Sequence, residues 1–152
     1  MFGVGSLFVS GSSASACDRA FAITNPPDLT EISGKGGVEV RGTACDGDQV
    51  WLFDRDPYDG RLYLDTERAP LEVVNGLWNF VDKPIGNPGA ADIGTTYTLV
   101  ALRASAKCNQ QLATARPNSK GEFEFRRLPS GCPDVNVVGS DVRKVRVRKA
   151  RL

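Results

Sequence analysis

The 152-residue sequence contains no histidine. Ser-His-Asp and Cys-His nucleophile systems need an imidazole to accept a proton, and haem sites and most catalytic zinc sites use histidine ligands. The sequence therefore excludes histidine-dependent nucleophilic catalysis and histidine-ligated metal centres. A metal site would have to use carboxylates or the four cysteines.

An excess of either charge is also lacking, because 19 Lys and Arg face 18 Asp and Glu, for a net charge of +1. No bulk field would attract the chain to nucleic acid or to an acidic membrane, and we expect no nucleic-acid partner. A hydrophobic content of 41% is sufficient for one core. The 16 Gly and nine Pro are scattered, which favours many short strands joined by turns.

A long hydrophobic run is missing at the N-terminus, where MFGVGSLFVS is apolar but shorter than the roughly 20 residues that cross a bilayer. In ASAC, Ala14 and Ala16 stand where a signal peptidase would cleave before Cys17, although the basic region of a signal peptide is absent. We expect residues 1–16 to be a signal-peptide remnant or a flexible leader, and residues 17–152 to form the domain. A membrane tether through this N-terminal segment is an open alternative, with a lipoprotein as its weaker variant because Ala14 replaces the usual leucine.

No CxxC motif occurs among the four cysteines, so zinc-ribbon and thioredoxin-like motifs are absent. Cysteines that are widely spaced and even in number favour two disulfides formed in an oxidising compartment. Four buried free thiols in a cytosolic core are the alternative. The cysteines are Cys17, Cys45, Cys108 and Cys132.

Alternation of apolar and polar residues predicts an all-β domain. About eight short strands with close turns favour a sandwich of two antiparallel sheets, with a closed barrel as the structural alternative. Only residues 106–115 could form a helical turn or two. The expected strands are 20–23, 37–44, 49–54, 61–64, 69–74, 76–81, 95–104, a short strand within 121–131, and one within 141–152.

The first two strands suggest one disulfide pairing. Facing residues of an antiparallel pair have a constant number sum. Ala22 opposite Val40 gives the same sum as Cys17 with Cys45, so this bond would join the start of one strand to the end of the other. Cys108 and Cys132 would then close the second loop. Four cysteines allow three connectivities, and a Cys45–Cys108 bond is the next alternative.

Several segments resemble bacterial immunoglobulin-like domains of secreted or membrane-attached, actinobacterial-type proteins. These are ITNPPDLTEISGKGGVEVRGTAC, NGLWNF, IGNPGAADIGTTYTLVALRASA and the closing FEFRRLP and VRVRK, together covering roughly residues 22–149. GEFEFRRLPSG is also similar to a strand of carboxypeptidase regulatory-like domains. The resemblance implies an immunoglobulin-like antiparallel sandwich of about seven or eight strands, with an adhesion, spacing or accessory binding role.

Two aspartate-rich turns are candidate calcium sites, because calcium takes several carboxylate and carbonyl oxygens from tight loops. Both fall at strand ends and could converge, but Pro57 and Tyr58 interrupt the usual ligand spacing. Aspartates that simply initiate turns are the more economical explanation. The candidate ligands are Asp46, Asp48, Asp54, Asp56 and Asp59, and no other cofactor is expected.

Aromatic residues are the candidates for a binding surface. Trp51 and Trp78 lie inside apolar strands, so we expect them in the core rather than on a sugar-stacking face. Tyr58 at a turn tip and Tyr63 beside it are better placed to be exposed. The basic strand DVRKVRVRK could contact phosphate, but its alternation is explained by an edge strand whose charges prevent aggregation.

These patterns predict a non-catalytic, extracytoplasmic binding or structural module. Its partner would be another protein or a surface polymer, bound by loops at one pole or by an exposed sheet edge. The first alternative is a cytoplasmic accessory or sensor domain, normally fused to an enzyme and lacking disulfides. A small hydrolase is less favoured, and a pocket that holds two nearby carboxylates with shifted pKa values would support it.

Overall fold

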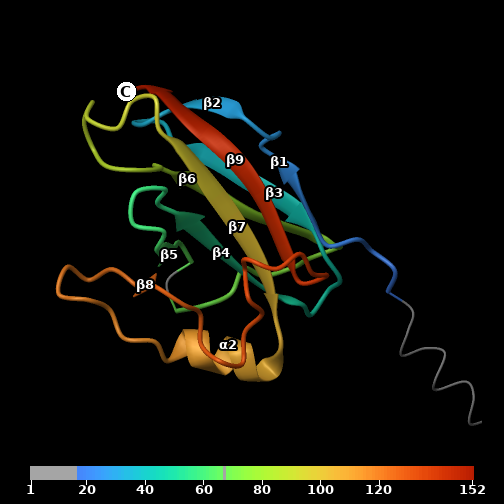
Figure 1. Ribbon diagram of the computed structural model, residues 1–152. Coiled ribbons are helices and arrows are strands. Elements are labelled where there is room, and N and C mark those ends of the chain that lie inside the picture. The colour runs from blue at the N-terminus through green and yellow to red at the C-terminus, as the bar shows by residue number, and fades with distance from the viewer. Residues whose placement is uncertain (1–16, 67) are drawn as a thin grey trace, which may run out of the picture.

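The protein is an all-β structure with one short helix, as the sequence predicted (Figure 1). The computed structural model describes residues 17–66 and 68–152, so the predictions for residues 1–16 lie outside the described residues. No helix in this part of the chain is long and apolar enough to cross a membrane. The elements are β1 Ala22–Asn25, β2 Thr30–Ser33, β3 Val38–Thr43, β4 Gln49–Arg55, β5 Leu62–Leu64, β6 Leu77–Lys83, β7 Thr96–Ala104, α2 Ala106–Ala113, β8 Glu124–Phe125 and β9 Val142–Arg151.

The strands form two sheets. One has three strands in the order β1-β3-β6, and the other has six in the order β2-β9-β7-β4-β5-β8. Neighbouring strands are antiparallel except β2 and β9, which are parallel. The two-sheet prediction is therefore confirmed, and the uniformly antiparallel arrangement is wrong at this one pair. Strand β2 was not predicted, because its four residues follow Pro26 and Pro27 in a segment with turn character.

The pairing of β1 with β3 is confirmed, but its predicted register is wrong. Ala22 lies opposite Thr43, and not opposite Val40, and a bulge shifts the ladder again before Asn25. The Cys17–Cys45 bond forms nonetheless, because Cys17 precedes β1 and lies outside the ladder.

The main core lies between the two sheets. Trp78 of β6 is 2% exposed, and its indole Nε1 donates to the Thr43 carbonyl oxygen over 3.1 Å. Its ring lies against Gly42, where an added Cβ would come within 2.1 Å of both the indole and the Ala22 carbonyl oxygen. A residue without a side chain is therefore required at this crossing of β1, β3 and β6. The remaining core includes Phe21, Ile32, Val40, Val50, Leu52, Ile85, Leu99, Val145 and Val147.

A second core covers the opposite face of the six-stranded sheet. Helix α2 and the segment 115–141 supply Leu112 and Val135, which pack against side chains of β4 and β7. Figure 1 shows this layer at the end of the molecule opposite the C-terminus. Because the sheet is buried on both faces, β4 and β7 read as nearly continuous apolar runs. This cluster comprises Trp51, Phe53, Leu62, Leu64, Val100, Leu102, Cys108, Leu112, Val135 and Val142.

Two local predictions are corrected by the structure. Strand β9 is not an edge strand, because it lies between β2 and β7. Its outward Arg146 and Arg148 pair with Asp28 and Glu31 on the β2 side, so the charges join two strands instead of protecting an edge. The expected strand at 69–74 forms only isolated bridges.

Both predicted disulfides are present, and the described cysteines include no free thiol. The Cα atoms of Cys17 and Cys45 are 6.0 Å apart, and those of Cys108 and Cys132 are 4.6 Å apart. The alternative Cys45–Cys108 bond is therefore excluded.

Candidate functional site

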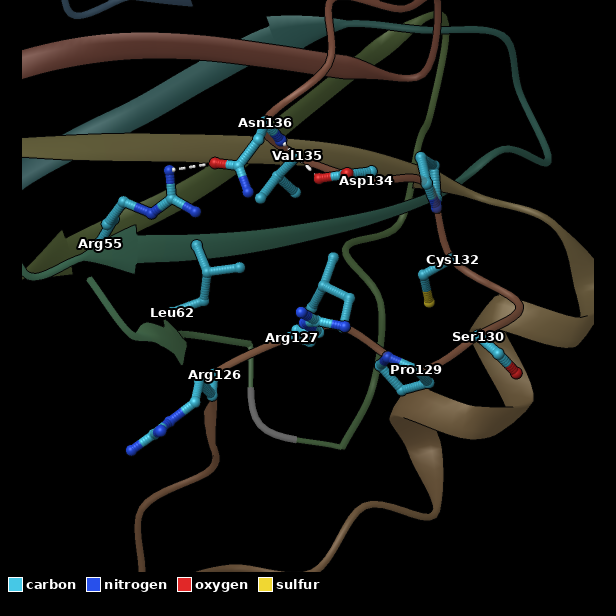
Figure 2. A pocket seen from close by; sticks show the side chains of 12 residues that line it. Arg55, Leu62, Arg126, Arg127, Pro129, Ser130, Cys132, Asp134, Val135 and Asn136 are labelled. Carbon is cyan, nitrogen blue, oxygen red and sulfur yellow. Dashed lines mark hydrogen bonds between the residues drawn. The ribbon is translucent and has the colours of Figure 1, made fainter. Parts of the chain in front are cut away.

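A cavity of about 410 Å³ opens where the end of β4 meets β5 and the segment 126–136 (Figure 2). A volume of this size is within the range of small-ligand sites. We call it the arginine pocket because three arginines contribute to its lining. The lining residues are Arg55, Leu62, Arg126, Arg127, Leu128, Pro129, Ser130, Cys132, Pro133, Asp134, Val135 and Asn136.

Arg55 is the most constrained of the three cations. It ends β4, and its Nη1 donates to the Asn136 side-chain oxygen over 3.0 Å, as the dashed line in Figure 2 shows. Its Nε–H is buried and has no acceptor among the described residues. A buried donor without an acceptor costs roughly 1–3 kcal/mol. The Arg55 guanidinium is thus oriented by one hydrogen bond and retains unused hydrogen-bonding capacity.

Arg126 and Arg127 follow β8 directly and are both exposed. In Figure 2 Arg126 extends away from the hollow, whereas Arg127 is seen end-on among the other lining residues. Within the described chain, none of the three arginines pairs with a carboxylate. The single acidic lining residue, Asp134, accepts a hydrogen bond from the Asn136 backbone N–H over 2.9 Å, which fixes a turn. The pocket therefore carries an uncompensated positive charge.

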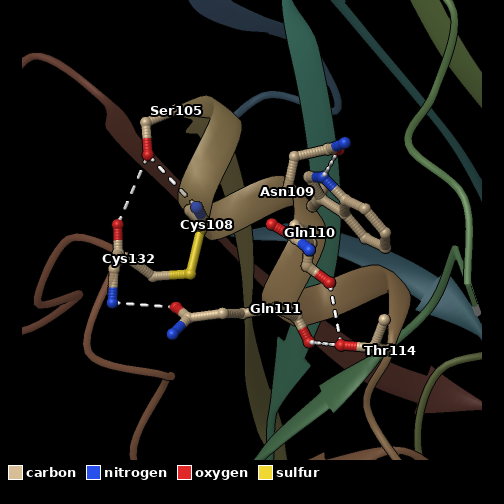
Figure 3. The surroundings of a disulfide bond; sticks show 9 residues. Ser105, Cys108, Asn109, Gln110, Gln111, Thr114 and Cys132 are labelled. Atoms are coloured by element: carbon tan, nitrogen blue, oxygen red, sulfur yellow. Dashed lines mark hydrogen bonds between the residues drawn. A yellow bond between two sulfur atoms is a disulfide. The ribbon is translucent and has the colours of Figure 1, made fainter.

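The wall of the pocket is attached to α2 by the Cys108–Cys132 disulfide (Figure 3). Cys108 is fully buried in α2, while Cys132 lines the pocket. The Gln111 side-chain oxygen accepts the Gly131 N–H over 2.9 Å, and the Ser105 hydroxyl caps the helix by accepting the Cys108 N–H. These contacts hold the segment 126–136 in place, although this segment contains no helix or strand.

Helix α2 is anchored to the sheet in turn. The Trp51 indole Nε1 donates to the Asn109 side-chain oxygen over 2.9 Å, and Trp51 is fully buried. The predicted core position of both tryptophans is confirmed. The arginine pocket was not predicted from the sequence, although Arg126 and Arg127 directly follow the GEFEF segment.

The predicted calcium ligands lie at opposite ends of β4. At its start, Asp46 Oδ1 accepts the Gly76 N–H and Asp48 Oδ2 accepts the Cys45 N–H. At its end, Asp56 Oδ1 accepts the Tyr58 N–H in the turn. The two turns therefore do not converge, and over 17–66 and 68–152 no group of three or more Asp, Glu, His or Cys residues is placed to hold a metal ion.

A second hollow of about 300 Å³ lies beside the end of β4. Asp54, Asp56 and Glu122 line it together with Tyr63. Burial, followed by a hydrogen bond to Asp59 Oδ2, raises the pKa of the Tyr63 phenol above its usual value. Three carboxylates and one ammonium group, that of Lys120, therefore line this hollow.

The two candidate tyrosines differ in exposure. Tyr58 is 80% exposed, and its hydroxyl lies 3.1 Å from that of Thr95. Tyr63 is half-buried in β5 and is held by Asp59. Tyr58 is therefore the more accessible of the two candidate binding residues.

A buried ionic cluster closes one end of the sandwich, and the sequence analysis missed it. Lys149 of β9 is 0% exposed and pairs with Asp92, which is 5% exposed. The Lys149 ammonium also donates to the carbonyl oxygens of Asn87 and Gly89 over 2.7 and 2.8 Å. Asp92 Oδ2 accepts the Tyr97 hydroxyl and the Asn87 N–H. All three protons of the ammonium are therefore used to hold the loop between β6 and β7.

The fold and its two bonded cysteine pairs define the class of the protein, an all-β sandwich braced by disulfides. No protein-family model, curated protein or solved structure matches the chain.

Proposed function

We propose that the protein is a non-catalytic binding module with an immunoglobulin-like scaffold that acts outside the cytoplasm. The two disulfides support an oxidising, extracytoplasmic environment. Its partner is another protein or a surface polymer.

The observation that carries the proposal is the position of the arginine pocket. It lies on a segment that is fastened to α2 by Cys108–Cys132 and to Arg55 through Asn136. A binding surface that is ordered before the partner arrives loses less conformational entropy on association. The construction therefore suits recognition of a partner.

The experiment measures binding of the purified, oxidised protein to intact envelopes of its source cells, over a range of protein concentrations. We expect saturable binding. A reduced and alkylated sample serves as the control and should bind more weakly, because the pocket wall is released. Binding that never saturates, or none at all, would contradict the proposal.

A small hydrolase is the second candidate, because Asp54, Asp56 and Glu122 line the second hollow. Paired carboxylates can act as general acid and base on a glycosidic bond. Release of the chromophore from nitrophenyl glycosides by the wild type, abolished in Asp54→Asn and Asp56→Asn variants, would support this candidate over a binding module.

A further inference from the structure

We propose that the arginine pocket receives an acidic side chain of a peptide segment in a partner protein, with an apolar neighbour of that side chain on the adjoining surface. The inference rests on the proposed function and names the chemistry of the partner.

The charge of the pocket selects an anionic group. Within the described chain, Arg55, Arg126 and Arg127 line the hollow without a carboxylate partner, and the one acid in the lining, Asp134, is engaged in a turn. Guanidinium groups bind a carboxylate through paired N–H donors, and such charged hydrogen bonds are about twice as strong as neutral ones. Among the described residues the Arg55 Nε–H has no acceptor, and a bound carboxylate would provide one.

The apolar surface next to the pocket selects a peptide over a highly charged polymer. Leu128 and Pro129 line the pocket and are partly exposed, whereas Leu62 and Val135 are buried beneath it. Directly after Asn136, Val137 is 60% exposed and Val138 is fully exposed at 101%. A repeating polyanion would leave this apolar surface exposed to water. A glutamate or aspartate followed by an aliphatic residue would place its carboxylate at the arginines and the aliphatic side chain on Val137 and Val138.

The test is an NMR titration of the ¹⁵N-labelled, oxidised protein with two capped tetrapeptides, Ala-Glu-Leu-Ala and Ala-Gln-Leu-Ala. Inorganic phosphate is the third probe. We expect the glutamate peptide to shift the Arg55 Nε–H resonance and the amides of residues 126–138. The glutamine peptide and phosphate should bind at least about tenfold more weakly, since each lacks one of the two recognised features.

Variants locate the site. Arg127→Gln should weaken binding of the glutamate peptide at least about tenfold, because it removes a charged donor from the lining of the pocket. Arg151→Gln is the matched control, an exposed arginine at the other end of the molecule, and should leave the affinity unchanged. Unchanged resonances far from the pocket show that each variant is folded. The shift of the Arg55 Nε–H resonance is measured in the wild type, so it does not depend on the folding of a variant.

Equal binding of the glutamate and glutamine peptides would overturn the inference, as would phosphate binding as tight as the glutamate peptide, which indicates a simple anion site. Shifts confined to residues other than Arg55 and 126–138, or an unchanged affinity in Arg127→Gln, would also overturn it. Envelope binding that survives in Arg127→Gln would refute this inference but leave the proposed function intact. Peptide binding without envelope binding would refute the proposed function alone.

Discussion

At the scale of single residues, the burial of Lys149 can be predicted from the sequence, whereas its binding partners cannot. Val145, Val147 and Lys149 share one side of a strand with period 2, so Lys149 had to face the core. The alternation therefore indicates that Lys149 is buried, but it does not identify the residues that bind its ammonium group. Asn87, Gly89 and Asp92 lie in a loop rich in Gly and Pro, and their positions depend on the path of that loop over the end of the sandwich.

Lys149→Met should destabilise the protein by about 3–5 kcal/mol, because it leaves the buried Asp92 carboxylate without its cation. Urea unfolding followed by tryptophan fluorescence measures the change. The neighbouring Arg148→Gln is the control, since the Arg148–Glu31 pair is exposed and should matter little. Equal effects of the two substitutions would contradict the buried pair.

Asp92 also predicts a pH dependence. Burial alone would raise the pKa of its carboxyl, but hydrogen bonds from Lys149, Tyr97 and the Asn87 N–H, with the Lys149 charge, lower it to about 2 from the ordinary 3.8. A folded-state pKa below the unfolded one stabilises the protein above that ordinary value, and this contribution disappears as the pH falls toward 2. Unfolding free energies measured across this range should decline more steeply for the wild type than for Asp92→Asn. Parallel curves would be inconsistent with the shifted pKa.

At the scale of elements, the strands with strong alternation or long apolar runs were predicted well. The turn at Asn75-Gly76 was also recognisable, since both residues adopt positive φ angles of 55° and 76°. The predicted register of β1 was wrong at Ala22, which lies opposite Thr43, and a bulge between Ile23 and Asn25 that period-2 alternation does not reveal shifts the ladder again. Strand β2 was missed because its parallel pairing with β9 depends on residues more than 100 positions away.

Gly42→Ala tests the packing of β1, β3 and β6. The new methyl group would meet backbone and indole atoms at 2.1 Å, so the three-stranded sheet must shift and stability should fall by roughly 1–3 kcal/mol. Thermal unfolding provides the measurement. Gly36→Ala should be tolerated, because its nearest neighbours would be Ser33 atoms at 3.9 Å.

Removal of the Cys108–Cys132 bond tests how the pocket is held. The bond closes a separation of 24 residues, and its loss in Cys108→Ala/Cys132→Ala should cost on the order of 3 kcal/mol. Amide hydrogen exchange should accelerate mainly between residues 126 and 136. If exchange instead rose uniformly across β3 and β6, the bond would be bracing the whole fold and not this segment.

At the scale of the whole molecule, the six-stranded sheet organises the rest. One face packs on the three-stranded sheet, and the other packs on α2 and the segment 115–141. A sandwich expected from strand patterns accounts for the first face only. The second layer was not predictable, because 115–141 contains little regular structure and is positioned by Cys132, Asn136 and burial of Val135. That layer also carries the arginine pocket, which explains why the candidate site was the least predictable part.

Mapping the cysteine pairs in protein isolated from its own cells is the most direct test of this account. The protein is alkylated on harvest, digested without reduction, and analysed by mass spectrometry. We predict linked peptides joining Cys17 to Cys45 and Cys108 to Cys132, with no alkylated cysteine. Four alkylated cysteines, or a Cys45–Cys108 link, would contradict a disulfide-braced sandwich that works outside the cytoplasm.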